Sequence, residues 1–497
     1  MKNENQKLIA LEQKLADLDE AMTSAVEKRQ KQLDLIDSSQ LCAAKNLIHY
    51  LSLRSEDVRD LQTSLHELGL SSLASSESHI RRQLQAIRER LGKKYNDGEI
   101  SLCSHDWSKK DIKDKSTLLF GTKENSSLPY IMVTFDISFA DNYALIKNLL
   151  LNGMNIARIN CAHDDETTWA RMIQKLRKAV IKTGKSCKIY MDLAGPKIRT
   201  RILNKGAKKG KVKVKEGQII WLAENNTGFD KDDIVICPNE TGIIGLLKKG
   251  DRVYIDDGII QAEVYKIKED RASIRIVRIA ASKKQIKEGK GINFPDSDLN
   301  ISSLTSFDIS VLPFVCEYAD MVGYSFIREK SDLLYLHKVI SEISDKEPSI
   351  IIKIETPEAV INLPELLLEG MKSEVFGVMI ARGDLAVEIG FERMGEIQEE
   401  ILWICEAAHT PVIWATQVLE TMNKSGMATR SEITDAVKAG QAECVMINKG
   451  LHTIEVIETL KDIHQRTSEH RSKKRFIFRP LKIAKKFIDE TSQTHIH

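Results

Sequence analysis

The fold is decided by short apolar runs such as Ser349-Ile350-Ile351-Ile352-Lys353-Ile354-Glu355, in which β-branched residues follow one another almost without a break. A run of this length that is apolar on both faces is typical of a parallel strand, because helices cover both sides of a parallel sheet. Eight such runs follow one another along the chain: Tyr130–Phe135, Asn155–Asn160, Lys188–Leu193, Met321–Phe326, Ser349–Glu355, Val375–Ala381, Pro411–Gln417 and Cys444–Asn448.

Amphipathic stretches lie between these runs. Leu145, Ile146, Leu149 and Leu150 have helical spacing before Gly153, and a second stretch from Trp169 to Val180 ends near Gly184. Glycine commonly follows the last turn of a helix. Eight strands that alternate with helices predict an α/β fold, a (β/α)₈ or TIM barrel.

Three further parts surround the expected barrel. Alternating runs between Arg199 and about Lys290 predict a β-rich domain inserted after the third strand, where it can act as a lid over the active-site end. Helical spacing from Leu8 to Met22 predicts a helical N-terminal extension, and the polar segment from Ser104 to Ser127 indicates a connector. We expect an extension with connector at 1–125, the barrel at 126–200 and 291–466, the lid at 201–290 and a basic tail at 467–497.

Composition excludes several classes of protein. The 73 basic and 71 acidic residues give a net charge of +2, which offers no overall attraction for nucleic acid or a membrane surface. No apolar run approaches the length of a membrane span and none follows the polar N-terminus, which favours a cytoplasmic location. The eight cysteines form no CxxC pair, so neither a zinc site nor a disulfide framework is expected.

Polar residues gather where the expected strands end. A single residue of this kind is more often a turn former, but barrel active sites are built at this edge and most of the strands contribute to the set. Lys353 and Glu355 are two apart and therefore face the same way in a strand. Glu355 and Asp384 are oxygen ligands suited to Mg²⁺, and a helix that opens at Gly383 would suit an anion. The set comprises Arg158, Asn160, Asp192, Ser325, Lys353, Glu355, Asp384 and Thr416.

These motifs resemble, in order, those of the pyruvate kinase family. The matching stretches are Gly153–Asn160, Gly195–Thr200, Ile255–Gly258, Ser325–Arg328, Lys353–Glu355, Ala381–Leu385 and Pro411–Gln417. The resemblance implies phosphoryl transfer from phosphoenolpyruvate to ADP, with Mg²⁺ as the metal and Mn²⁺ as a substitute.

The resemblance also implies roles for single residues. Lys353, Thr416 and Arg158 would be catalytic, and Glu355 and Asp384 would bind the metal. The substrate would contact Arg158, Ser325, Lys353, Gly383, Asp384 and Thr416. The nucleotide would contact Arg199, Lys290, Asn160 and His163.

The monovalent-cation site of the family is altered. Its usual Asn, Ser, Asp and Thr correspond to Asn160, Ala162, Asp192 and Leu193, so two oxygen ligands are missing. Lys197 stands where members that require potassium have Glu, which resembles the potassium-independent subgroup. An ammonium can replace a fixed K⁺ charge, so we expect activity without K⁺.

Other departures leave the phosphoryl acceptor open. Asp136-Ile137 replaces the usual Gly-Pro beside the nucleotide, and Asn448-Lys449-Gly450 replaces the usual Ser-Gly-Glu-Thr. We expect no C-terminal regulatory domain, which resembles a bacterial subgroup with a helical front end, and a homodimer or homotetramer. The basic tail, Arg471 to Lys486, is expected to be solvated, with an anionic effector or membrane surface as the alternative partner.

Three hypotheses therefore stand. The first is pyruvate kinase activity. The second is another pyruvate-enolate enzyme with a different acceptor or lyase chemistry, and the third is a non-catalytic regulatory protein built on the same barrel.

Overall fold

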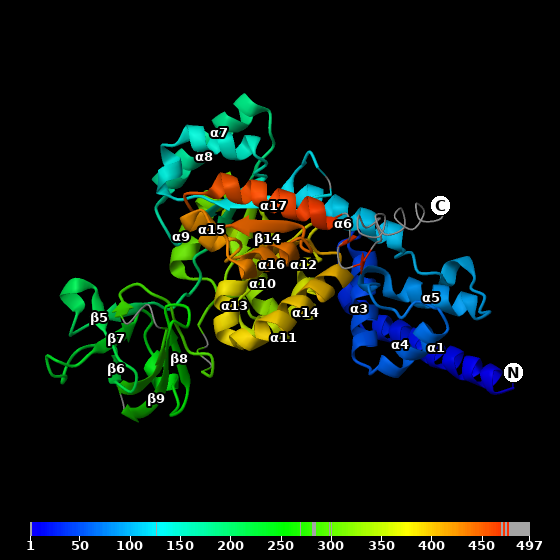
Figure 1. Cartoon of the computed structure of the whole chain (residues 1–497), viewed down its shortest axis with the longest axis horizontal. Helices are drawn as coiled ribbons and strands as arrows, with labels where there is room; N and C mark the ends of the chain where they lie inside the picture. Colours follow the sequence, from blue (N-terminus) through cyan, green and yellow to red (C-terminus); the bar gives the residue numbers. More distant parts are fainter. Residues whose placement is uncertain are drawn as a thin grey trace, which may run out of the picture.

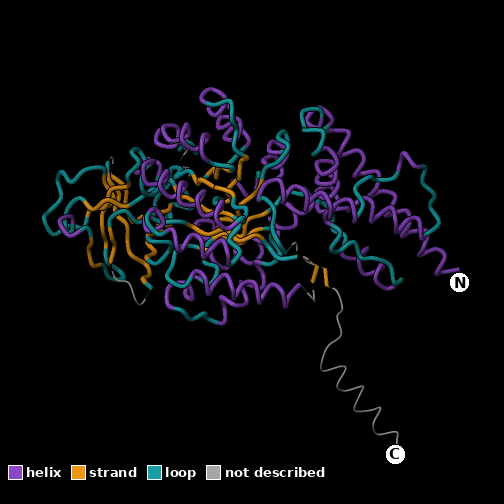
Figure 2. Tube along the Cα trace, turned by 90° about the horizontal axis from the view of Figure 1, so that it is seen from above, coloured by secondary structure: helices purple, strands orange, loops and turns teal. Residues whose placement is uncertain are grey.

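The computed structural model describes residues 2–125, 127–268, 270–280, 285–297, 299, 301–468, 471–472 and 475–476. A β-rich domain lies at one end of the molecule, a barrel in the middle and a helical N-terminal region at the other end (Figure 1). Figure 2 shows the strands in two main groups, one in the barrel and one in the β-rich domain. The predicted fold class, a barrel with a β-rich domain and a helical N-terminal region, is therefore confirmed.

The barrel is closed and all its strand pairs are parallel. Its strands, in spatial order, are β1 (Tyr130–Thr134), β17 (Cys444–Ile447), β16 (Val412–Ala415), β15 (Gly377–Ala381), β14 (Ser349–Ile354), β13 (Met321–Tyr324), β3 (Lys188–Asp192) and β2 (Ile156–Asn160). All eight predicted strands are present, each within the range expected from its apolar run.

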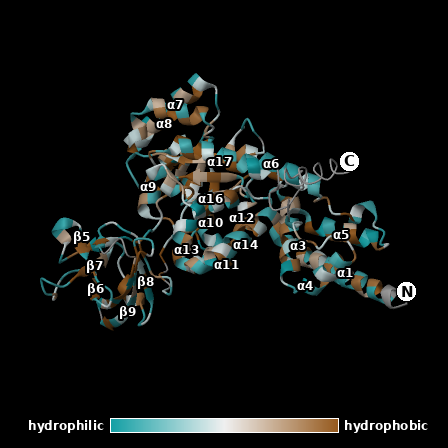
Figure 3. Cartoon of the chain, in the orientation of Figure 1, coloured by the Kyte–Doolittle hydropathy of each residue, from teal (hydrophilic) through white to brown (hydrophobic). Residues whose placement is uncertain are grey.

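Helices cover the outside of the barrel. They are α7 (Tyr143–Leu151), α8 (Glu166–Thr183), α9 (Ser306–Tyr318), α10 (Lys330–Ile343), α11 (Pro357–Ile361), α12 (Leu363–Gly370), α13 (Arg382–Ile389), α14 (Met394–Ala407), α15 (Glu420–Ser425), α16 (Arg430–Ala439) and α17 (Thr453–Ser468). Helix α8 begins after Asp165, whose side chain accepts from the amide of Thr168, and ends at Gly184 in the left-handed conformation. Brown and teal alternate along the helices, as amphipathic packing requires (Figure 3).

The two faces of each barrel strand enter different cores. Ile351 of β14 joins the cluster inside the barrel with Tyr190, Met379 and Ile413. Ile350, Ile352 and Ile354 of the same strand instead join the larger cluster beneath the helices. This alternation explains why the run is apolar on both faces.

The polar segment from Ser104 to Ser127 is not a simple connector, and that expectation was wrong. It contains helix α6 (His105–Phe120), which is capped by the hydroxyl of Ser104. Leu119 and Phe120 at its end join the interior cluster, and the ring of Phe120 lies 5.2 Å from that of Tyr130, the first residue of β1. Helix α6 therefore closes the N-terminal end of the barrel, and it is polar both because one face meets solvent and because Ser108, Lys115 and Ser116 are buried polar residues.

The N-terminal region packs α1 (Lys2–Lys28), α2 (Gln30–Leu33), α3 (Leu41–Arg54), α4 (Arg59–Glu67) and α5 (Ile80–Arg90). Leu11, Leu15 and Met22 of the predicted stripe are buried, whereas Leu8 is exposed. Asn46 of α3 donates to the carbonyl of Ala407 at 2.8 Å and so ties this region to α14. The stripe serves packing, as expected.

The β-rich domain is a seven-stranded sheet in the order β12-β8-β9-β10-β6-β7-β4 with a separate β5-β11 pair. The strands are β4 (Thr200–Ile202), β5 (Lys211–Lys213), β6 (Ile219–Ala223), β7 (Val235–Pro238), β8 (Arg252–Ile255), β9 (Ile260–Lys268), β10 (Arg271–Ile279), β11 (Gln285–Lys287) and β12 (Ile292–Asn293). It has its own core, centred on residues such as Leu222, Val253 and Ile274. The predicted inserted domain is confirmed.

Within the described residues, every helix is too short or too polar to cross a membrane. The basic tail expected at 467–497 lies outside the described residues, apart from the end of α17 and the short pair β18 (Arg471–Ser472) and β19 (Arg475–Phe476).

Candidate active site

Lys353 lies at the centre of the rim where the barrel strands end. It faces the same way as Ile351, two residues earlier on β14, and therefore points into the mouth of the barrel. Its Nζ lies 2.6 Å from Ser325 Oγ, 3.0 Å from Glu355 Oε1 and 3.2 Å from Asp192 Oδ1. Burial opposes the charged ammonium, but Asp192 and Glu355 outweigh it and raise the pKa of Lys353.

Asp192 holds two cations at this rim. Its Oδ2 accepts from Nε and Nη2 of Arg158 at 3.0 and 2.5 Å, while Tyr190 donates to Oδ1 at 3.1 Å. Burial would raise the pKa of Asp192, but Lys353 and Arg158 lower it overall. Asp192 was expected in an altered monovalent-cation site; in the structure it fixes Lys353 and Arg158, with Thr134 accepting from Arg158 Nη1 at 3.1 Å.

Glu355 and Asp384 are the carboxylates that could hold a metal. Burial, and also the charge of Asp384, raises the pKa of Glu355 although Lys353 opposes it. The two carboxylates repel each other, and a divalent cation held by both would relieve that repulsion. No group of three or more His, Cys, Asp or Glu side chains suited to a metal occurs in the described part of the chain. Two carboxylates fit Mg²⁺, which commonly takes its other ligands from substrate and water.

Thr416 and the start of α13 form the adjoining part of the rim. Thr416 has φ of 68°, and its buried Oγ1 has no hydrogen-bond partner among the described residues. A Cβ built on Gly383 would lie 3.4 Å from that hydroxyl. Gly383 and Asp384 are in the first turn of α13, as predicted, where backbone N–H groups lack partners within the helix. An unpartnered hydroxyl beside a helix N-terminus suits the carboxylate of a substrate.

Arg382 supports the Thr416 turn, a role that the sequence did not indicate. Its Nε donates to the carbonyl of Ala415 at 3.1 Å, and Nη2 donates to the carbonyl of Thr416 at 2.5 Å. The guanidinium also pairs with Asp435 and lies 4.5 Å from the ring centre of Trp414. Only the motif containing Arg382 could have drawn attention to this residue, because its partners come from other elements.

The expected nucleotide residues are only partly gathered. Partial burial of the ring, then the charges of Lys449 and Arg199, lower the pKa of His163, so these three residues share one electrostatic neighbourhood. Arg199 donates to the carbonyl of Gly289 at 3.0 Å. Lys449 was noted in the sequence only as a departure from the family pattern, yet it adds a cation beside His163.

Lys290 and Asn160 have other partners. Lys290 pairs with Asp256 of the lid at 2.9 Å, and Asn160 accepts from the amide of Ala162 at 3.0 Å. Neither side chain is bonded to another expected nucleotide contact among the described hydrogen bonds.

The lid meets the barrel at α13. Lys197 Nζ lies 2.6 Å from Asp384 Oδ1, and Asn293 donates to Glu388 Oε1 at 2.7 Å. Lys197 therefore pairs with a candidate metal ligand and not with Asp192, so its substitution for K⁺ stays a prediction. Burial raises the pKa of Glu388 to about 7.

Comparison with known proteins places this rim in a family. The model of the pyruvate kinase barrel domain matches residues 130–451. A pyruvate kinase of Bacillus licheniformis is 30% identical over 361 residues, which cover 71% of this chain and 59% of the relative. One of Geobacillus stearothermophilus is 31% identical over 337 residues, covering 66% and 55%.

A third relative is matched over more of its length. The pyruvate kinase of Thermotoga maritima is 32% identical over 330 residues, which cover 65% of this chain and 67% of the relative. The chain thus spans less than two thirds of the length of the first two relatives. The matched region contains every strand of the barrel and each rim residue described above, and the chain therefore belongs to the pyruvate kinase family.

Proposed function

We propose that this chain transfers the phosphoryl group of phosphoenolpyruvate to ADP, giving pyruvate and ATP. The observation that carries the proposal is the position of Lys353. Its ammonium is held by Asp192, Glu355 and Ser325 beside a third carboxylate, Asp384. Phosphoryl transfer depends mainly on positioning and on cations around the moving charge.

The geometry supports a defined orientation of phosphoenolpyruvate. Its carboxylate would lie against the backbone N–H groups of Gly383 and Asp384 and the unpartnered hydroxyl of Thr416. Its phosphate would face Lys353 and Arg158, which Asp192 keeps in place without neutralising both. The phosphoryl group then lies between its cations while the other end of the substrate is fixed.

Mg²⁺ would be held by Glu355 and Asp384, with Mn²⁺ as the substitute. When bound, the metal would neutralise charge on the phosphoryl oxygens. Asp384 would first have to release Lys197, with which it pairs at 2.6 Å. K⁺ is not expected to be required.

In the transfer itself, the bond from phosphorus to the enol oxygen breaks and a bond to a β-phosphate oxygen of ADP forms. Lys353 stabilises the phosphoryl group during this step. The enolate that leaves takes up a proton at C3, and Thr416 lies near that proton path. Arg199 and Lys449 offer cationic contacts for the phosphates of ADP, and the ring of His163 beside them offers an N–H donor. Lys290 and Asn160 are further contacts from the lid hinge and the rim.

The alternatives gain no support from the relatives named above, all of which are pyruvate kinases. No contact described at the rim favours lyase chemistry or a non-catalytic role over phosphoryl transfer. A cytoplasmic location and a dimeric or tetrameric assembly stay predictions.

Two parallel incubations test the proposal. The purified chain is supplied with phosphoenolpyruvate, Mg²⁺ and ADP, and separately with pyruvate in deuterated water. Pyruvate formation that requires ADP is the expected result. Deuterium exchange without phosphoryl transfer would instead support an enolate enzyme with another acceptor, and a folded protein that does neither would exclude both enzyme hypotheses.

A further inference from the structure

A second cavity lies at the opposite end of the barrel from Lys353. It has a volume of about 470 Å³ and is lined by α6, by the segment between α6 and β1, by the ends of α14 and α17, and by the turn between α16 and β17. Tyr130 and Glu443 on its wall stand at the N-terminal ends of their strands, whereas Lys353 stands near the C-terminal end of β14. The volume suits a small metabolite.

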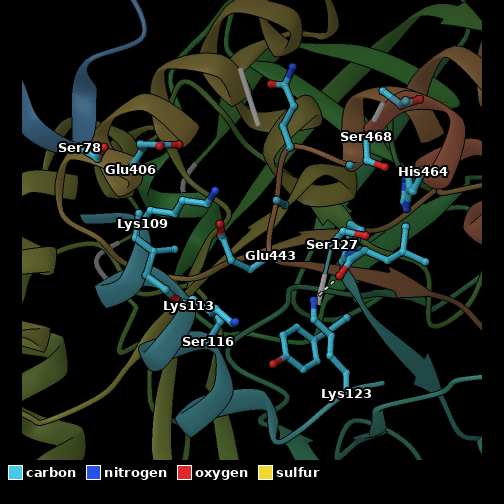
Figure 4. A pocket seen from close by; sticks show the side chains of 18 of the residues that line it. Ser78, Lys109, Lys113, Ser116, Lys123, Ser127, Glu406, Glu443, His464 and Ser468 are labelled. Carbon is cyan, nitrogen blue, oxygen red and sulfur yellow. Dashed lines mark hydrogen bonds between the residues drawn. The ribbon is translucent and has the colours of Figure 1, made fainter. Parts of the chain in front are cut away.

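One wall of this cavity is cationic. Lys109 and Lys113 are one turn apart on α6, and Figure 4 shows both beside the hollow together with Lys123. Within the described ion pairs neither Lys109 nor Lys113 has a partner, while the nearby Lys110 and Lys115 are paired with Asp114 and Asp111. Two like charges at this spacing destabilise a helix unless an anion compensates them.

Lys123 adds a third cation, whose charge is disfavoured by its surroundings. It donates to the carbonyl of Leu128, and its Nζ lies 3.9 Å from the ring centre of Tyr130. Burial, and also the charge of Lys113, lowers the pKa of Lys123 to about 8 although Glu443 opposes this. An anion bound between Lys113 and Lys123 would relieve their repulsion.

The turn between α16 and β17 contributes an unpartnered hydrogen-bond acceptor to the cavity. Gln441 is 8% exposed, and its buried Oε1 has no hydrogen-bond partner in the part of the chain that the structure describes. Glu406 and Glu443 also line the cavity (Figure 4). A hydrogen-bond donor on a ligand would satisfy the buried Oε1 of Gln441, which an anion alone cannot do.

We propose that this cavity is a binding site for a small metabolite with an anionic group at one end and hydrogen-bond donors at the other. The anionic group contacts Lys109, Lys113 and Lys123, and a donor faces the unpartnered Oε1 of Gln441. The donors can be hydroxyl or ammonium groups, and the site is independent of the phosphoryl-transfer chemistry at the other end of the barrel.

Titration calorimetry on the full chain tests the proposal with four probes. O-phosphoethanolamine and glycerol 3-phosphate combine an anion with ammonium or hydroxyl donors, while inorganic phosphate and glycerol each supply one half. At least one of the first two probes is expected to bind about tenfold or more tightly than phosphate or glycerol, because a charge-assisted hydrogen bond is added. Whichever of the two binds more tightly identifies the donor class.

Three variants locate the binding. The double variant Lys109→Met/Lys113→Met should weaken it about tenfold or more, whereas Lys110→Met, on the same helix but paired with Asp114, should leave it unchanged. Gln441→Leu should weaken binding without lowering the melting temperature of the ligand-free chain, because it removes an unpartnered buried acceptor. Absence of binding by both combined probes, or binding that survives the double lysine variant, would overturn the proposal.

Discussion

Lys353 is buried between two carboxylates, and this arrangement makes its ammonium the most constrained charge at the rim. Replacing it by Met should lower kcat by about 10²–10³-fold or more, because charge developing on the phosphoryl group loses its nearest protein cation. Steady-state kinetics measures the effect, and circular dichroism checks the fold. Lys188→Met is a matched control, because Lys188 pairs with Asp320 at the far end of the barrel. This variant should keep the kcat of the wild type. Turnover that survived in Lys353→Met would mean that another cation performs this role.

A variant of Thr416 can distinguish a role in substrate binding from a role in supporting the fold. Thr416→Val removes a hydroxyl that has no partner within the described structure, so the melting temperature should stay the same or rise. The KM for phosphoenolpyruvate should rise about tenfold if the hydroxyl binds the substrate carboxylate. A variant with unchanged KM and lowered stability would show that Thr416 only supports the turn held by Arg382.

Lys197 determines the expected response to potassium. If the ammonium of Lys197 takes the place of the monovalent cation, the wild type should be equally active in buffers that contain only Na⁺ or only K⁺. Lys197→Glu should then need K⁺ for full activity. Rates compared in matched chloride salts measure this, and either a wild type inactive in Na⁺ or a variant indifferent to K⁺ would contradict the expectation.

Helix α6 is the element whose packing matters most for the barrel. Phe120 is 1% exposed inside the barrel cluster, so Phe120→Ala should lower the free energy of unfolding by about 3–5 kcal/mol. Leu118, two residues earlier, is 50% exposed, and Leu118→Ala should change the free energy of unfolding by less than about 0.5 kcal/mol. Denaturant unfolding of the two variants and the wild type measures these free energies. Equal effects would show that α6 does not close the barrel.

The contact between the lid and α13 should make stability depend on pH. Burial raises the pKa of Glu388 from 4.5 to about 7, so in this window the folded chain binds a proton that the unfolded chain lacks. Stability contributed by this group therefore falls as the pH rises through the window. Between about pH 5 and pH 8, the melting temperature of Glu388→Gln should fall less than that of the wild type. The measurements are made without metal. If the melting temperatures of the variant and the wild type depend on pH in the same way, Glu388 does not couple stability to pH.

For the whole molecule, the sequence predicts what depends on local patterns. The eight β-branched runs predict the barrel, and the two-residue spacing of Lys353 and Glu355 predicts their shared orientation. Helix α6 escapes such prediction because only a narrow part of it is apolar, and because the surface that it covers is assembled from strands distant in the sequence.

Contacts across the site depend equally on the assembled fold. Asp192 is the last residue of an ordinary strand, and nothing local to it indicates that it holds both Arg158 and Lys353. The pairing of Lys197 with Asp384 joins the base of the inserted domain to α13, far along the chain. Residue types at strand ends therefore locate the site, while their partners emerge only in three dimensions.

The central claim is phosphoryl transfer at the rim that surrounds Lys353, and ³¹P NMR tests it most directly. The full chain is incubated with phosphoenolpyruvate, ADP and Mg²⁺ while the phosphorus signals are followed. The account predicts that the phosphoenolpyruvate signal is replaced by the γ-phosphate of ATP in equal amount. A phosphoenolpyruvate signal that persists with folded protein, or that disappears without formation of ATP, would contradict it.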